Sequence, residues 1–252
     1  MAKRIVKEFI GPEIKMWFPI PNDGEINFKA RIRPEKIAIP IRVIEGVQQF
    51  IRKCLKDISG YSKLELDGMI VGLSGGIDSV TVASLCKRAI SGTRYFLKGI
   101  ILGRGPFGSQ GEMTDFEYED VLYALKSAKE IGIEYEYLDI SSIVGSIYST
   151  FPSCGKWELS GILPRIRSIL LLQMADNLNA VCVGTTNGTE LILGAFTVGG
   201  PAGHFSPLAD FYKCEVYKIA EILGVPQYII NRRPLISELG ICDEQLYGAF
   251  CY

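Results

Sequence analysis

Two glycines, two serines and an aspartate share one short joint of the chain, the segment Ser74–Ser79. An apolar run, residues 69–73, ends directly before it, and a second run with helical periodicity, residues 79–90, follows. This order predicts a buried strand that enters a helix through a glycine turn. A helix N-terminus attracts anions through its unpaired N–H groups and its dipole, and glycines let the backbone approach closely. The segment is therefore typical of a phosphate-binding loop.

Asp78 is the unexpected member of this set, because a carboxylate repels a phosphate unless a divalent cation lies between them. Mg²⁺ prefers carboxylate and phosphate oxygens. We therefore interpret Asp78 as a Mg²⁺ ligand, with Ser74 and Ser79 as hydroxyl donors to phosphate. The segment has neither the lysine of the nucleotide-hydrolase P-loop nor the dinucleotide-binding glycine spacing. The simplest structural alternative is a capped turn that binds no ligand.

The elements that must position this loop alternate along the chain. Apolar runs predict strands over residues 68–73, 95–102, 134–140 and 180–185. Helical periodicity predicts helices within residues 41–60, 79–90, 114–133, 161–179 and 210–226. This alternation predicts an α/β fold with a doubly wound, mostly parallel sheet and helices on both faces. Residues 1–38, rich in proline, are predicted to form an N-terminal arm, and residues 39–252 a single domain.

The composition excludes several classes of protein. A net charge of −1 over 252 residues gives no basic footprint for nucleic acid, and no segment has the length and apolarity of a membrane span. No signal peptide is predicted at the start. Seven dispersed cysteines without a C-x-x-C pair favour a reducing, cytoplasmic location. The single histidine, His204, excludes sites with several histidine ligands.

The glycine loop and four ordered segments after it carry a resemblance to a known family. The Ser-Gly-Gly-x-Asp-Ser loop resembles the pyrophosphate loop of ATP pyrophosphatases, which cleave ATP between the α and β phosphates. Arg-x-Pro-Phe-Gly-x-Gln at 104–110, the stretch 183–197, and the stretches 207–230 and 243–248 resemble segments of the ammonia-dependent NAD synthetases. The resemblance runs from about Pro40 to Gly248 and implies the HUP-like fold of the ATP pyrophosphatases.

The resemblance implies a two-step reaction that uses ATP and Mg²⁺. A substrate carboxylate, that of deamido-NAD, displaces pyrophosphate from ATP, and ammonia then displaces AMP to leave an amide. The matched positions imply catalytic roles for Lys213 and Asp78 and metal ligation by Asp78 and Glu190. ATP binding is implied for Ser74, Gly75, Gly76, Asp78, Ser79, Arg104, Gln110, Thr185 and Lys213.

Simpler structural roles compete with several of these assignments. Arg104 is also explained as a solvated residue at a strand end, and Glu190 as a cap at the start of a helix. Lys213 lies early in a predicted helix, where a cation is mildly unfavourable, so an anionic partner is expected. Asp243 and Glu244 are equally well explained as an acidic helix start. Cys182 is expected in the core and His204 in a loop.

The chain departs from the family pattern in the half that binds the acid substrate. Val198 and Pro201 replace a lysine and an aspartate, and Leu235 or Ile236 replaces a Ser/Thr near the phosphates. Arg165 and Arg167 survive in a helix segment that has otherwise changed, and we assign Arg165, Arg167 and His204 to the acid-substrate side. Two explanations compete: a divergent NAD synthetase whose site is rebuilt with Arg232, Arg233 or His204, which we favour, or an amide ligase for another carboxylic acid.

Two functions other than amide formation are alternatives for the same residues, and the reaction itself needs partners. A subunit that binds ATP or AMP without turnover remains an alternative, and transfer-RNA thiolation is disfavoured because cysteine pairs and a basic surface are missing. The segment before the domain is too short for a glutamine-hydrolysing domain, so ammonia is expected to be free or supplied by a separate glutaminase. The resemblance implies a homodimer, with the leucine-rich helix at 163–177 as a candidate interface.

Overall fold

A computed structural model describes residues 37–62, 65–105, 115–151, 156–200, 203–232, 235–236 and 241–242. The N-terminal arm predicted at residues 1–38 lies almost wholly outside these ranges, so the proposed domain division stays a prediction. Gln110, Arg233, Asp243 and Glu244 also lie outside the described residues.

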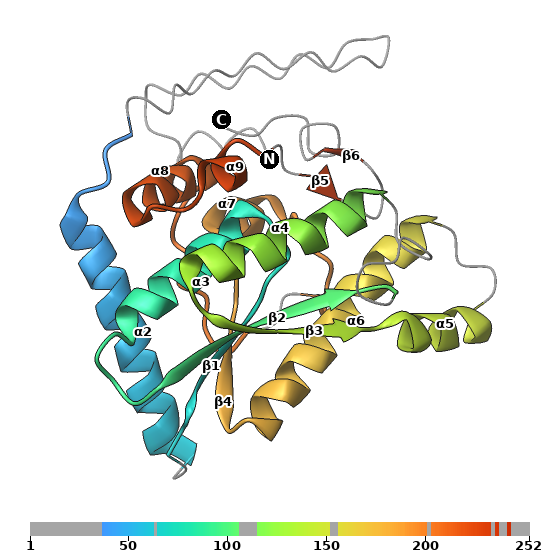
Figure 1. Cartoon of the computed structure of the whole chain (residues 1–252), viewed down its shortest axis with the longest axis horizontal. Helices are drawn as coiled ribbons and strands as arrows, with labels where there is room; N and C mark the ends of the chain where they lie inside the picture. Colours follow the sequence, from blue (N-terminus) through green and yellow to red (C-terminus); the bar gives the residue numbers. More distant parts are fainter. Residues whose placement is uncertain are drawn as a thin grey trace, which may run out of the picture.

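The centre of the fold is a parallel sheet of four strands in the order β3-β2-β1-β4 (Figure 1). The strands are β1 (Gly68–Gly72), β2 (Phe96–Gly103), β3 (Glu134–Asp139) and β4 (Ala180–Val183). In register, Gly68 of β1 lies opposite Phe96 of β2 on one side and Ala180 of β4 on the other. The strand order therefore reverses at β1, where the carboxyl ends of β1 and β4 open a crevice of the kind that binds ligands in doubly wound sheets. The predicted fold class is confirmed.

Helices cover both faces of the sheet (Figure 1). One face packs against α2 (Ile41–Ser62), α3 (Ile77–Ala89), α4 (Asp115–Ile131), α8 (Lys213–Leu223) and α9 (Gln227–Ile230). The other packs against α5 (Ser141–Thr150) and α6 (Lys156–Asn177). The short helix α7 (Gly188–Leu193) follows β4, and β5 (Leu235–Ile236) pairs antiparallel with β6 (Ile241–Cys242). Among the described helices, none has the combined length and apolarity needed to cross a membrane.

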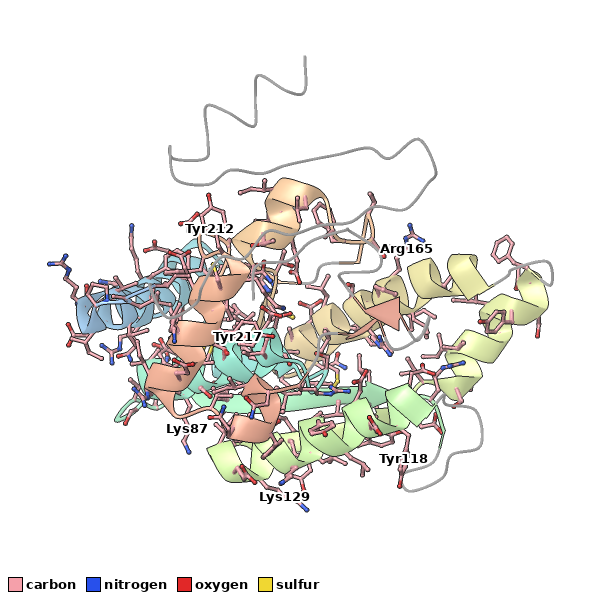
Figure 2. The ribbon with its side chains drawn as sticks, turned by 90° about the horizontal axis from the view of Figure 1, so that it is seen from above. Lys87, Tyr118, Lys129, Arg165, Tyr212 and Tyr217 are labelled. Carbon is pink, nitrogen blue, oxygen red and sulfur yellow. The ribbon has the colours of Figure 1, made fainter. Side chains whose placement is uncertain are left out.

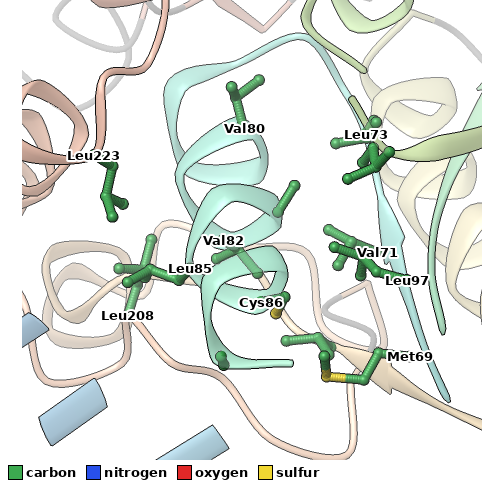
Figure 3. Packing of buried hydrophobic residues seen from close by; sticks show 14 of the residues in the cluster. Met69, Val71, Leu73, Val80, Val82, Leu85, Cys86, Leu97, Leu208 and Leu223 are labelled. Atoms are coloured by element: carbon green, nitrogen blue, oxygen red, sulfur yellow. The ribbon is translucent and has the colours of Figure 1, made fainter. Parts of the chain in front are cut away.

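Helix α3, which carries the phosphate-loop residues at its start, is buried on nearly every side. Val80, Val82 and Leu85 are fully buried. Figure 3 shows them between Met69 and Val71 of β1, with Leu73 just after it, and Leu208 and Leu223 beyond the helix. Each fully buried aliphatic side chain contributes about 1.5–3 kcal/mol. The core therefore holds the N-terminus of α3 firmly against the carboxyl end of β1.

Helix α6 differs from its predicted form. It begins at Lys156, five residues before the predicted start, and carries Pro164 in its interior. Leu163, Ile166 and Leu171 are buried, whereas Ile169 and Leu172 are 68% and 40% exposed. Part of this helix thus belongs to the core, and its use as a dimer interface stays a prediction.

Candidate functional site

The loop Ser74–Ser79 is structured by its own hydroxyl groups. Ser79 Oγ donates to the Gly76 carbonyl (3.0 Å) and accepts from the Ser74 N–H (3.3 Å), while Ser74 Oγ accepts from the Gly76 N–H (3.3 Å). Gly75 adopts the left-handed conformation, φ +77°. Gly76 is the N-cap of α3 and supplies no side-chain cap. The first turn of α3 thus keeps the N-terminal geometry that binds phosphate.

Three elements converge on the carboxylate of Asp78. Lys213 Nζ, at the first position of α8, forms an ion pair with Oδ2, and Asn187 Nδ2 donates to Oδ1 (3.0 Å). The side chains of Lys213 and Asp78 are only 6% and 16% exposed. The structure therefore brings together Asp78 and Lys213, the two residues predicted to be catalytic, although they lie 135 positions apart.

Asn187 also fixes the position of Glu190. The side-chain oxygen of Asn187 accepts from the Glu190 N–H (3.0 Å), and the backbone N–H of Asn187 donates to Glu190 Oε2 (3.1 Å). These two hydrogen bonds form a capping box at the start of α7. The capping role considered for Glu190 is thus present. Because Asn187 contacts both acids, Asp78 and Glu190 flank the same polar centre.

The charges around Lys213 act in opposite directions on its pKa. Burial favours the neutral amine, but the carboxylates of Asp78 and then Glu190 outweigh burial and raise the pKa of Lys213 above its ordinary value. Lys213 therefore carries its full charge at neutral pH. A cation held at this position is well suited to neutralise phosphate oxygens.

The donor set fits Mg²⁺. Asp78 and Glu190 are carboxylates in the first turns of two helices, α3 and α7, and both accept hydrogen bonds from Asn187. Mg²⁺ is commonly held by one or two carboxylates together with substrate phosphates and water. Among the described residues no cluster of three or more metal-ligating side chains occurs.

A cavity of about 220 Å³ opens at the carboxyl ends of β1, β2 and β4, where Ser74 of the phosphate loop lines it. Four of the predicted site residues line it, namely Ser74, Arg104, Thr185 and Arg167. Glu117 and Asp120 of α4, Ser168 of α6 and Thr186 also line it. The cavity thus occupies the crevice where the strand order reverses.

Arg104 is held in the cavity wall by a buried ion pair. Its guanidinium makes a two-pronged contact with the Glu117 carboxylate, one prong of which, from Nε to Oε1, measures 3.0 Å. Glu117 is only 4% exposed and Arg104 only 11%. The solvated strand end considered as an alternative for Arg104 is therefore wrong.

The backbone next to Arg104 is also fixed. The Gly105 N–H donates to Asp139 Oδ1 (2.9 Å), and the Tyr137 hydroxyl donates to the Gly105 carbonyl (2.6 Å). Hydrogen bonds from Ser141 and Gly105 hold the pKa of the Asp139 carboxyl below its usual range. The end of β2 is thus pinned by β3, which places Arg104 over the cavity.

Substituting Glu117 with glutamine tests this assignment. Glutamine keeps the shape of the Glu117 side chain but removes its charge, so the buried guanidinium of Arg104 loses its counter-ion. We expect a loss of about 3–5 kcal/mol in the free energy of unfolding. Urea denaturation measures it. Glu65→Gln is the matched control, because Glu65 is 82% exposed in its pair with Arg94, and we expect a much smaller loss of stability. Equal effects in both variants would contradict the buried-pair assignment.

Two residues assigned to the acid substrate lie outside the cavity. Arg165, on the exposed side of α6 (Figure 2), donates to the carbonyls of Val198 (2.9 Å) and Gly161 (3.1 Å). The exposed His204 accepts from the Cys182 N–H through Nδ1 (3.1 Å). Arg165 thus holds the loop in which Val198 replaces the family's lysine. Of this group only Arg167 lines the cavity.

The sequence interpretation missed several residues of the site. Asn187 is fully buried and follows β4. It forms an N-x-x-E spacing with Glu190, which is a sequence signal for a capping box and could have been recognised. Glu117 and Asp120 lie three positions apart on α4 and share one face, but nothing local shows that they meet arginines. Arg232, considered for the acid-substrate side, instead binds Asp120 and the Gly75 carbonyl.

Comparisons with known proteins identify the family of this chain. The model of the family described as NAD synthase matches residues 43–245. The NH(3)-dependent NAD(+) synthetase of Archaeoglobus fulgidus is 36% identical over 194 residues, which cover 77% of this chain and 72% of that protein.

Solved structures give the same result. The NMN synthetase of Francisella tularensis superposes with a TM-score of 0.70 at 25% identity, covering 84% of this chain and 83% of that one. The NH3-dependent NAD synthetase of Campylobacter jejuni, solved with a nitrate ion, gives 0.65 at 28% identity, covering 77% of each chain. Sequence and fold agree: this chain belongs to the NAD synthase family of carbon–nitrogen ligases.

Proposed function

We propose that this chain amidates deamido-NAD to NAD with ATP and ammonia. The observation that carries the proposal is the buried Asp78–Lys213 pair at the start of α3, in a chain whose family model spans residues 43–245. Burying a charged pair costs free energy unless hydrogen bonds or a bound ligand compensate both groups. Here it lies where phosphate and Mg²⁺ would complete it.

In the first step the substrate carboxylate attacks the α-phosphorus of ATP, and the bond to the β-phosphate oxygen breaks. The Gly76 N–H, the hydroxyls of Ser74 and Ser79 and the charge of Lys213 bind the leaving pyrophosphate. Stabilising charge that develops on a leaving group in this way is the main source of catalysis in phosphoryl and nucleotidyl transfer. Asp78 and Glu190 would hold Mg²⁺, which when bound neutralises phosphate charge.

In the second step ammonia attacks the acyl carbon of the adenylate, AMP leaves, and a proton is lost to form the amide. Arg104 and Thr185, which line the cavity, bind the nucleotide, and Gln110 is assigned the same role from its motif. Arg167 is the residue best placed for the acid substrate. Arg165 supports that part indirectly, because it holds the loop at Val198. We also propose a homodimer and a supply of ammonia as the free molecule or from a separate glutaminase.

The test is an assay of purified protein with MgATP, ammonium and deamido-NAD, in which pyrophosphate and NAD are both measured. We expect one pyrophosphate per NAD at roughly 1 s⁻¹ or faster, the range of ordinary enzymes. Deamido-NMN is assayed in parallel, because one similar structure is an NMN synthetase. Faster amidation of deamido-NMN, or ATP binding without pyrophosphate release, would contradict the proposal.

A further inference from the structure

Arg232, just after α9, reaches the back of the phosphate loop. Its Nη1 donates to the Gly75 carbonyl (3.2 Å), and its Nη2 forms an ion pair with Asp120 of α4. The guanidinium lies 4.4 Å from the ring centre of Tyr123, also of α4. Its side chain is only 13% exposed. One arginine thus joins the loop to α4.

The bond to the Gly75 carbonyl determines where the next N–H points. In a planar trans peptide, the carbonyl of one residue and the N–H of the next point in opposite directions. Because Arg232 holds the Gly75 oxygen on the α4 side, the Gly76 N–H faces the other way, toward Oγ of Ser74 at 3.3 Å, and Ser74 lines the cavity. Rotation of this peptide would remove a donor from the phosphate side.

A stack of aromatic rings and cations holds Arg232 in place. The rings of Tyr123 and Tyr228 stack with centres 5.8 Å apart, and Lys126 Nζ lies 3.8 Å from the centre of the Tyr228 ring. Arg232 lies against Tyr123 and Lys126 against Tyr228, so each ring of the stacked pair contacts one cation. Cation–π contacts of this kind stabilise by about 0.5–2 kcal/mol each, so the stack fixes α9 and Arg232 against α4.

We propose that Arg232 is a positioning residue that orients the Gly75–Gly76 peptide for pyrophosphate. The inference rests on the proposed function, in which this loop binds the leaving pyrophosphate. Arg232 acts through the loop backbone. Its substitution should therefore weaken the binding of MgATP and pyrophosphate and leave the binding of the acid substrate unchanged.

The test compares Arg232→Met and Arg232→Lys with wild type. Methionine keeps the apolar stem on Tyr123 but removes both polar contacts. We expect the KM for MgATP to rise and the affinity for magnesium pyrophosphate, measured by calorimetry, to fall by about tenfold or more, the effect of one lost charged hydrogen bond. The KM for deamido-NAD should stay within twofold. Lysine can pair with Asp120 but lacks the fork that also reaches Gly75, so it should restore stability and not affinity.

Arg88→Met is the matched control, because Arg88 donates to the Leu223 carbonyl (3.0 Å) at the opposite end of α3. It should lower stability without changing pyrophosphate affinity. If Arg232→Met and Arg232→Lys bind magnesium pyrophosphate as tightly as wild type, Arg232 is only structural and the inference fails. If wild type binds pyrophosphate but makes no NAD, the proposed function fails while the binding comparison still decides the role of Arg232.

Discussion

Lys213→Met is expected to lower kcat/KM for MgATP by about two to three orders of magnitude, the size of effect seen when one preorganised charge donor is removed from a reaction centre. The reason is that Lys213 is a buried cation already paired with Asp78 at the phosphate loop. Methionine has a similar volume and no charge. Steady-state kinetics with varied MgATP, at saturating deamido-NAD and ammonium, measures the loss.

Lys218→Met separates this effect from a general effect on α8. Lys218 lies on the same helix and pairs with Glu221 at 2.9 Å near the surface, so its loss should leave kcat/KM within twofold. Lys213→Met also leaves Asp78 without its cation, which is expected to cost up to about 3–5 kcal/mol in the free energy of unfolding. The assays are therefore run well below the melting temperature of the variant. Retention of activity within threefold would refute the role of Lys213.

The raised pKa of Lys213 fixes the sign of its pH dependence. A lysine with a folded-state pKa above its unfolded value stabilises the protein fully below the unfolded pKa, about 10.4. That contribution is lost only as the pH rises through the folded-state pKa. No step from Lys213 is therefore expected between pH 7 and 10 in either stability or activity.

The sheet was predictable because its strands are local features. Residues 68–73 and 180–185 are short apolar runs bounded by polar residues, and β1 and β4 fall within them. The helix after the Gly-Gly turn was equally local, and α3 begins at Ile77, within two residues of the prediction. Their parallel pairing follows from the strand–helix alternation, since a parallel pair needs a crossover.

The contacts of the arginines were not predictable in the same way. Arg104 was assigned to the nucleotide from its motif, but its partner Glu117 comes from α4 and depends on how that helix lies on the sheet. Arg165 and Arg232 bind backbone carbonyls, those of Val198 and Gly75. Because every residue has a carbonyl, no residue type in the sequence marks such a partner. These roles need the tertiary structure.

Gly75→Ala is expected to cause the second large loss, because two independent penalties fall on one residue. Gly75 has φ +77°, where a side chain is strained, and an added Cβ would lie 2.4 Å from the Asp120 carbonyl oxygen. The strain alone costs about 1–2 kcal/mol, and forced overpacking adds about 1–3 kcal/mol. Since Asp120 O belongs to the backbone of α4, the loop must move away from the helix instead.

Gly92→Ala carries the first penalty alone, so its comparison with Gly75→Ala isolates the second. Gly92 has nearly the same backbone, φ +75°, but an added Cβ meets nothing within 4 Å. Urea denaturation should show a loss of about 1–2 kcal/mol for Gly92→Ala and a clearly larger one for Gly75→Ala. Affinity for magnesium pyrophosphate should fall only in Gly75→Ala, because only there does the peptide that carries the Gly76 N–H shift. Equal losses of stability would mean that α4 yields to the methyl group, and unchanged affinity would mean that this peptide does not contribute to the site.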